Sequence, residues 1–185
     1  MTYTIAVLIG STRKGRKGEI VGTWVAEQCA QHDITVHIID PIIYTDLQVI
    51  HTPHHYADAP SEQLRTVHGL LEKSDGFIVV TPEYNHSFSG AIKNVLDMFM
   101  PEYEKKPFGI VSYSASDFGG IRANEALRPV ISELGAVPTP TPLIISKVHE
   151  AFSERKLTDV AYEKRFTEFF EEFMWYVKTL KVGRN

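Results

Sequence analysis

The sequence predicts an α/β protein in which helices cover a parallel sheet. Short apolar runs of strand length alternate with stretches of helical periodicity over nearly the whole chain, and this alternation is typical of repeated strand-helix units. The chain has 185 residues, of which 43% are hydrophobic and 23% charged. Such a chain suits one soluble domain with a single core. We therefore expect residues 1–185 to form a single domain.

Five strands and five helices are predicted in alternation. The strands are expected at residues 4–9, 34–39, 76–81, 108–113 and 137–145, and the helices at about residues 19–32, 61–74, 89–100, 120–134 and 158–180. The helix predictions rest on apolar residues that recur at intervals of three and four. These are Ile92, Val95, Leu96, Phe99 and Met100 in the third helix, and Phe166, Phe169, Phe170, Phe173, Val177 and Leu180 in the last. Both apolar faces should pack on the sheet.

The last strand carries proline at alternate positions. Pro138, Pro140 and Pro142 place their missing N–H groups on one side of an extended backbone, and that side cannot pair with a neighbour. We therefore expect this strand at an edge of the sheet. Five strand-helix units that end at an edge fit a flavodoxin-like three-layer sandwich with a five-stranded parallel sheet in the order 2-1-3-4-5. Residues 42–60 form the one long irregular connection.

Charge and composition exclude several classes of protein. The net charge of −4 argues against general nucleic-acid binding, which usually needs a broad basic face. No apolar run approaches the roughly 20 residues that cross a bilayer, and the first residues lack the features of a signal peptide. We expect a cytoplasmic protein without membrane partners. Cys29 is the single cysteine, and its helical face, shared with Val21 and Val25, predicts a buried apolar role.

The loop GSTRKGRKG follows the first predicted strand and has the chemistry of an anion cradle. Ser11 and Thr12 offer hydroxyl groups, Arg13 and Arg16 offer charge, and the following helix offers free N–H groups at its positive end. The alternative is a solvated basic turn. The spacing of its glycines resembles a nucleoside-triphosphatase loop, but Arg16 replaces the lysine and Lys17 the Ser/Thr that ligates magnesium. The sequence therefore disfavours triphosphate hydrolysis.

Two further loops leave the carboxyl ends of strands. The loop TPEYNHSFSG follows the third strand and YSASDFGG the fourth. In an open parallel sheet these ends converge with the first loop, where ligands bind. The donor-rich second loop can present backbone N–H groups to the edge of a flat heterocycle. The alternative is that Ser87 or Ser89 merely caps the next helix.

At these residues the chain resembles a known family. GSTRKGRKG together with PEYNHSFSGAIKNVLD resembles the NADPH-dependent FMN reductase family, which includes chromate, quinone and azo-dye reductases. The similarity extends from about Thr4 to Leu143, and PEYN followed by SGAIKNVLD is its more specific part. The resemblance implies FMN as the cofactor and NADPH, or NADH, as co-substrate.

The resemblance also implies which residues bind FMN. It assigns the phosphate to the first loop, the isoalloxazine ring to the second, and the other border of the ring to the third. The implied residues are Ser11, Arg13, Arg16, Gly18 and Glu19 for the phosphate, Pro82, Glu83, Tyr84 and Asn85 along the ring, and Tyr113, Ser114, Gly119 and Gly120 beside it. The third loop departs from the common family version, because residues 115–118 lengthen it.

The implied mechanism needs no dedicated acid, base or nucleophile, since a flavin accepts the hydride itself. We therefore expect no catalytic side chain. The nicotinamide gives a hydride to the flavin and leaves, and a quinone, flavin, azo compound or similar acceptor then takes two electrons at the same place. Backbone amides of the second and third loops are expected to stabilise negative charge on the reduced ring. Family resemblance also makes a homodimer or homotetramer plausible.

Two other functions stay open at this point. A flavodoxin-type electron carrier would bind FMN without oxidising a nicotinamide, although flavodoxins usually build the first loop from Ser, Thr and Gly, whereas this loop is basic. A flavin-free regulatory protein would share only the fold. His51, His54 and His55 could suggest a metal, but no acidic or cysteine partner follows at a familiar spacing, so no metal is expected.

Overall fold

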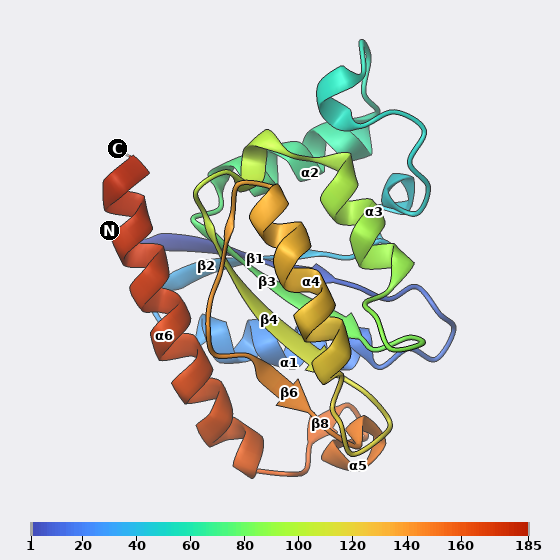
Figure 1. Cartoon of the computed structure of the whole chain (residues 1–185), viewed down its shortest axis with the longest axis vertical. Coiled ribbons are helices and arrows are strands. Elements are labelled where there is room, and N and C mark those ends of the chain that lie inside the picture. The colour runs from blue at the N-terminus through green and yellow to red at the C-terminus, as the bar shows by residue number, and fades with distance from the viewer. Residues whose placement is uncertain (1, 185) are drawn as a thin grey trace.

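The computed structural model describes residues 2–184, and its central feature is a parallel sheet. The order β2-β1-β3-β4-β5 confirms the predicted flavodoxin-like topology. The strands are β1 (Tyr3–Ile9), β2 (Ile34–Ile39), β3 (Gly76–Pro82), β4 (Pro107–Tyr113), β5 (Val137–Pro138) and β6 (Leu143–Ile145), and the helices are α1 (Gly18–Ala30), α2 (Glu62–Lys73), α3 (Gly90–Met98), α4 (Ile121–Glu133), α5 (Val148–Ala151) and α6 (Ala161–Arg184). Helix α4 lies in front of the sheet and α1 behind it (Figure 1).

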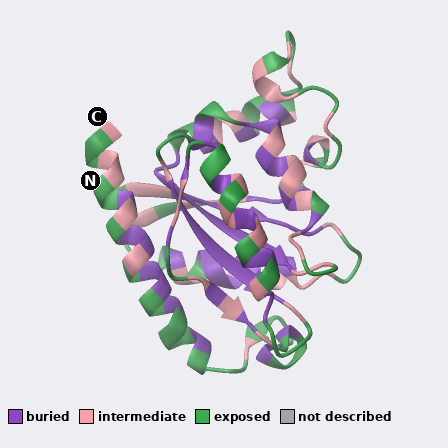
Figure 2. Cartoon of the chain, in the orientation of Figure 1, coloured by how far each residue is buried: buried purple, intermediate pink, exposed green. Residues whose placement is uncertain are grey.

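Successive residues of the central strands enter two separate apolar layers. Val7 and Ile78 face α1 and α6, whereas Leu8 and Val79 face α2, α3 and α4. Strands covered on both faces need apolar residues at every position, which explains the continuous runs in the sequence. The helices turn their buried stripes to the sheet and expose their outer faces (Figure 2).

The predicted fifth strand is two short strands, and this corrects the sequence analysis. β5 and β6 both pair in parallel with β4 at the edge, but residues 140–142 leave the ladder after the Thr139 N–H has donated to the Phe108 carbonyl at 2.8 Å. The prolines of this segment have no N–H group with which to continue the ladder. A side chain from α4 therefore binds its free carbonyl groups. Arg128 donates to the carbonyls of Thr139 and Pro140 at 3.0 and 2.9 Å. The edge position itself is confirmed.

Cys29 is fully buried in the layer between α1 and the sheet, as predicted. Burial raises the pKa of its thiol to about 12, so at pH 8 only about one thiol in ten thousand is ionised. We expect a thiol reagent to leave the native protein unmodified and to react with one group per chain in guanidinium chloride. Rapid reaction of the native protein at the unfolded rate would contradict this burial.

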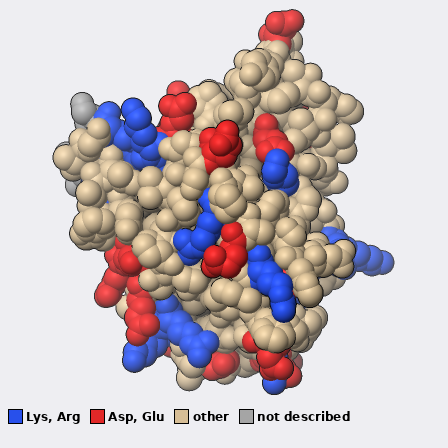
Figure 3. Space-filling view, in the orientation of Figure 1, with Lys and Arg blue, Asp and Glu red and all other residues tan. Residues whose placement is uncertain are grey.

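Three connecting segments contain structure that the sequence did not indicate. The long connection holds two short helices, η1 (Thr45–Leu47) and η2 (His54–Tyr56), and a third, η3 (Pro101–Tyr103), precedes β4. After β6, α5 leads into a hairpin of β7 (Phe152–Ser153) and β8 (Lys156–Leu157). Within residues 2–184, no helix is long and apolar enough to cross a membrane. Acidic and basic side chains are interspersed over the face shown in Figure 3.

Candidate functional site

A cavity of about 340 Å³ opens at the carboxyl ends of β1, β3 and β4. The three loops converge there as predicted, and α5 adds a further wall. The cavity is lined by Arg13, Lys14, Gly15, Arg16 and Lys17 of the first loop, Pro82, Glu83 and Tyr84 of the second, Tyr113, Ser114 and Ala115 of the third, and Val148 and His149 of α5.

The first loop gives one side of this cavity uncompensated positive charge. Arg13, Lys14 and Lys17 line it, and none of them has a carboxylate within 4.0 Å among residues 2–184. Helix α1 begins beside them at Gly18 without a side-chain cap, so its first N–H groups and the positive end of its dipole remain available. This arrangement suits a bound phosphate or another anion.

Arg16 differs from its basic neighbours because a carboxylate holds it. Its Nη1 and Nη2 donate to the two oxygens of Asp40 at 2.6 and 2.5 Å, and Nη1 also donates to the carbonyl of Ser11. The side chains are only 9% and 5% exposed. The hydrogen bonding of its guanidinium to Asp40 raises the pKa of Arg16. Arg16 therefore ties the first loop to the end of β2, and its charge is largely compensated.

Ser11, Gly18 and Glu19 lie at the base of the first loop and do not line the cavity. The Tyr113 hydroxyl donates to Oγ of the fully buried Ser11 at 3.2 Å. Burial raises the pKa of Tyr113, so this hydroxyl keeps its proton. Gly18 packs against the hydroxyl groups of Ser11 and Tyr113. Glu19 forms an exposed ion pair with Arg155. Ser11, Gly18 and Glu19 therefore support the conformation of the first loop and do not face the cavity.

The second loop is a tight turn pinned at both ends. Tyr84 and Ser87 exchange two backbone hydrogen bonds of 2.9 and 3.1 Å, and Asn85 and His86 both have positive φ, 51° and 65°, as in a type I′ turn. The N–H of Glu83 is bound to the Tyr113 carbonyl. The predicted donors of Glu83 and Tyr84 are thus already engaged. The N–H groups of Asn85 and His86 have no bonded partner within the described chain.

Side chains fix this turn to its surroundings. The Glu83 carboxylate accepts from the Arg122 backbone N–H at 3.1 Å and pairs with its guanidinium, which caps the start of α4. Ser89 caps α3 by accepting from the Ile92 N–H at 3.2 Å, which confirms the capping interpretation for that serine. Its hydroxyl also donates to the Gly10 carbonyl, so the first and second loops are joined.

His86 is an L-residue in the left-handed region, and this conformation carries a cost of about 1 kcal/mol or more. We expect His86→Gly to stabilise the fold by about 0.5 to 1 kcal/mol, measured by urea unfolding. His86→Ala is the control, because it removes the same ring but keeps the strained backbone. Equal stability losses in both variants would show that the imidazole itself contributes contacts.

The two loops also meet through an aromatic contact. The Arg13 guanidinium lies 3.5 Å from the centre of the Tyr84 ring, within the range of a cation–π interaction. Arg13 therefore bridges the basic side of the cavity and its aromatic side. Among the second-loop residues predicted to bind a ligand, Asn85 at the tip of the turn does not line the cavity.

The glycines of the third loop serve the backbone and do not line the cavity. Gly119 and Gly120 have φ of 61° and 87° and are buried where the chain enters α4. A Cβ on Gly120 would lie 2.9 Å from the Tyr113 backbone nitrogen. Tyr113 and Ser114, in contrast, line the cavity. Ser114 also accepts, at 2.9 Å through its carbonyl, from the Val148 N–H of α5.

The sequence analysis missed part of the cavity wall. The missed residues are Lys14, Gly15, Lys17, Ala115, Val148 and His149. Lys14 and Lys17 lie inside the predicted basic loop, so the loop itself was the signal for them. Val148 and His149 follow the carboxyl end of β6, which reaches the same edge of the sheet. A search of every strand end would have found them.

Comparisons with known proteins point to one group of enzymes. The family model described as NADPH-dependent FMN reductase matches residues 3–150. A quinone reductase of Pseudomonas putida is 31% identical over 135 residues, which are 68% of each chain. An FMN-dependent NADPH-azoreductase of Staphylococcus saprophyticus is 26% identical over 171 residues, covering 88% of this chain and 85% of the relative.

A solved structure shares nearly the whole fold. It is the flavoenzyme NAD(P)H:(acceptor) oxidoreductase FerB of Paracoccus denitrificans, with a TM-score of 0.79 and 26% identity. The match covers 96% of this chain and 98% of that one. It therefore includes most of α6, which lies beyond the end of the family match at residue 150.

Proposed function

Because this chain belongs to the NADPH-dependent FMN reductase family, we propose that it uses bound FMN to pass two electrons from NADPH or NADH to a small-molecule acceptor by a ping-pong mechanism. Quinones, flavins and azo compounds are the proposed acceptor classes, in keeping with the activities named for its relatives. The observation that carries the proposal is a cavity at the start of α1 that is lined by Tyr84, Tyr113 and three cations, none of which has a carboxylate within 4.0 Å among residues 2–184.

The described residues fit the chemistry of FMN. Arg13 and Lys17, with the first N–H groups of α1, are proposed to bind the phosphate. Pro82, Tyr84 and Tyr113 supply the apolar and aromatic surface for a flat ring, and all three line the cavity. Arg16 is proposed to act indirectly, by holding the loop through Asp40 and the Ser11 carbonyl. This assigns Arg16 a positioning role in place of a direct contact.

Bound FMN would supply the redox chemistry, accepting a hydride and releasing two electrons. The chain's own residues orient the cofactor and offer hydrogen-bond donors at fixed positions. The N–H groups of Asn85 and His86 have no bonded partner among residues 2–184, but neither residue lines the cavity, so no charge-stabilising role is assigned to them. No side chain of the cavity is assigned an acid or base role.

An absorbance spectrum before and after anaerobic addition of NADPH tests this function. A flavin spectrum that bleaches supports the reductase. A flavin band that persists with both NADPH and NADH would instead identify an electron carrier of the flavodoxin type. A colourless protein that cannot bind added FMN would overturn the proposal and leave the basic loop to another anion.

Arg13→Ala should weaken FMN binding about 10- to 150-fold, because one charge-assisted contact is worth about 1.5 to 3 kcal/mol. Fluorescence titration of the flavin-free protein measures this change. Arg165→Ala is the matched control, since Arg165 also stacks on a tyrosine, 5.0 Å from the centre of the Tyr162 ring, but lies on α6. Equal FMN affinity in the Arg13 and Arg165 variants would rule out a phosphate contact from Arg13.

We further propose that residues 1–185 act as a single FMN-binding domain, in the cytoplasm and as a homodimer or homotetramer. One central six-stranded sheet with an apolar layer on each face supports the single domain. Neither nucleic acid nor a membrane is a proposed partner. Sedimentation of the FMN-loaded protein would test the oligomer.

A further inference from the structure

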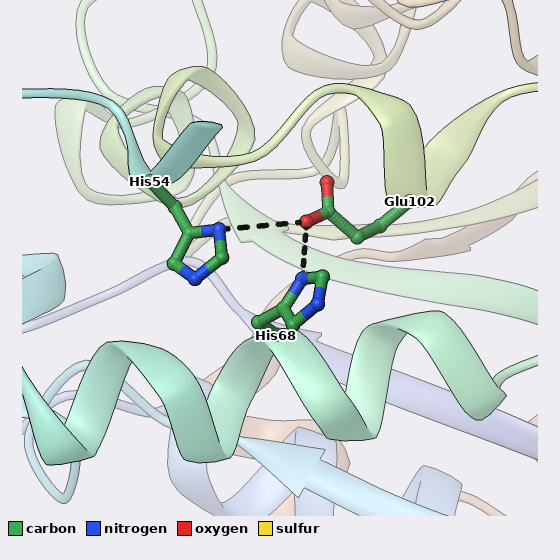
Figure 4. Close-up of side chains that lie close together, drawn as sticks. All are labelled: His54, His68 and Glu102. Carbon is green, nitrogen blue, oxygen red and sulfur yellow. Dashed lines mark hydrogen bonds and ion pairs between the residues drawn. The ribbon is translucent and has the colours of Figure 1, made fainter. Parts of the chain in front are cut away.

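Two histidines and a buried glutamate meet on the side of the sheet covered by α2. His54 comes from η2 in the long connection, His68 from the middle of α2, and Glu102 from η3 before β4. Both imidazoles point toward the same carboxylate (Figure 4). One ligand atom from each residue lies within 4.8 Å of the others. The connection alone offers no acidic partner at a familiar spacing, and the fold supplies one from a distant segment.

Hydrogen bonds alone do not account for this arrangement. The Glu102 side chain is only 4% exposed, and its Oε1 lies 2.6 Å from Nδ1 of His68. Nδ1 of His54 faces the same oxygen at 3.8 Å, which is too long for a hydrogen bond. The two rings also stack, with centroids 4.4 Å apart and planes at 18°. If both rings were protonated, the two imidazolium ions would repel each other at this distance. Ion pairing of both histidines with Glu102 therefore does not explain why they stack beside it.

The surroundings supply the outer features of a metal site. Nε2 of His68, the nitrogen on the far side of the ring, lies 3.9 Å from the exposed Glu72 carboxylate. This separation is too long for a hydrogen bond, but the flexible Glu72 side chain can reach the nitrogen and supply the acceptor that ligating histidines usually have. The second oxygen of Glu102 accepts from the Met100 N–H at 3.1 Å, which orients the carboxylate. A cavity of about 350 Å³ opens beside the cluster and leaves room for a water ligand.

We propose that His54, His68 and Glu102 bind one divalent transition-metal ion, for which Zn²⁺ is the best match. Two imidazoles, one carboxylate and an open position form a ligand set that zinc accepts. Bonds of about 2.0 to 2.2 Å place tetrahedral ligands about 3.3 Å apart, so small side-chain movements bring the three groups to the ion. The site shares no residue with the cavity proposed for FMN, and it would join the long connection to α2 and η3.

Zinc titration of the FMN-loaded protein, after removal of metal by a chelator and without a histidine tag, tests the site. Calorimetry should show one ion per chain with a Kd in the micromolar range or below. His54→Ala, His68→Ala and Glu102→Gln should each weaken binding at least tenfold. His51→Ala is the matched control, because His51 is an exposed histidine of the same connection outside the cluster. It should bind zinc like the wild type.

Thermal unfolding gives a second readout that does not depend on reductase activity. Zinc at about one hundred times its Kd should raise the Tm of the wild type and of His51→Ala by about 5 to 10 °C. The Glu102→Gln variant keeps its shape and, because it binds zinc at least tenfold more weakly, its Tm should rise by at most about half as much at the same zinc concentration. The proposal is overturned if the wild type shows no saturable binding at 100-fold molar excess of zinc over protein, or if His54→Ala binds zinc as tightly as the wild type.

Discussion

Replacing Asp40 by alanine should destabilise the protein by about 3 to 5 kcal/mol, because it leaves the nearly buried guanidinium of Arg16 without its counter-charge. The two side chains are 9% and 5% exposed and share two short hydrogen bonds. Arginine cannot escape by losing its proton. The unpaired guanidinium must therefore move into water and displace the first loop. FMN affinity should then fall together with the free energy of unfolding.

Urea unfolding of flavin-free Asp40→Ala measures the first effect and FMN titration the second. Arg155→Ala is the control, because it also breaks an arginine–carboxylate pair, with Glu19, but the side chains are 60% and 44% exposed. An exposed pair contributes about 0 to 1 kcal/mol, so this variant should stay close to the wild type. If Asp40→Ala is as stable as Arg155→Ala, the buried Arg16–Asp40 pair does not contribute more to the free energy of unfolding than an exposed pair.

The double variant Arg16→Met/Asp40→Ala separates positioning from direct contact. Removing both charges should recover much of the stability, because no buried charge is left unpaired. If Arg16 only positions the loop, single Arg16→Met and single Asp40→Ala should weaken FMN binding to a similar degree. A far greater loss in Arg16→Met would mean that its guanidinium contacts the phosphate, as the family resemblance first implied.

The order of strands and helices could be predicted because the burial of each element leaves a pattern of apolar residues in its own stretch of sequence. The continuous apolar runs of the inner strands follow from burial on both faces, and the stripe of Phe166, Phe169 and Phe173 on α6 is buried as its spacing indicates. Alternate prolines correctly indicated an edge. They did not indicate that the strand would break, because that depends on Arg128 of another helix binding the freed carbonyls.

The candidate site was predictable at the level of loops but not of individual side chains. Strand ends meet at one edge of any parallel sheet, so the convergence of the loops followed from topology. The roles of Arg13 and Arg16 did not follow, because they have the same chemistry in the same loop. What separates them is Asp40, which is distant in sequence and holds only Arg16. Likewise, His54 gains its partners from α2 and η3.

Adding a single methyl group at Gly18 should destabilise the protein by about 2 to 3 kcal/mol and abolish stable FMN retention. A Cβ there would overlap Oγ of Ser11 and come within 2.6 Å of the Tyr113 hydroxyl. Both neighbours are buried, and overpacked interiors typically lose about 1 to 3 kcal/mol. The Ser11–Tyr113 hydrogen bond should break as well. The start of α1 would shift, and with it the N–H groups proposed to bind the phosphate.

Gly69→Ala makes the same change in the interior of α2, where a new Cβ meets nothing within 4 Å, so it should stabilise the helix by about 1 kcal/mol. Urea unfolding measures both effects. Opposite signs would show that the close contact with Ser11 and Tyr113 is the reason why residue 18 must be glycine. The triple variant Ser11→Ala/Gly18→Ala/Tyr113→Phe removes both overlapping oxygens and should regain part of the lost stability. If Gly18→Ala instead unfolds like the wild type and keeps its flavin, the base of the first loop tolerates displacement, and its geometry does not determine FMN binding.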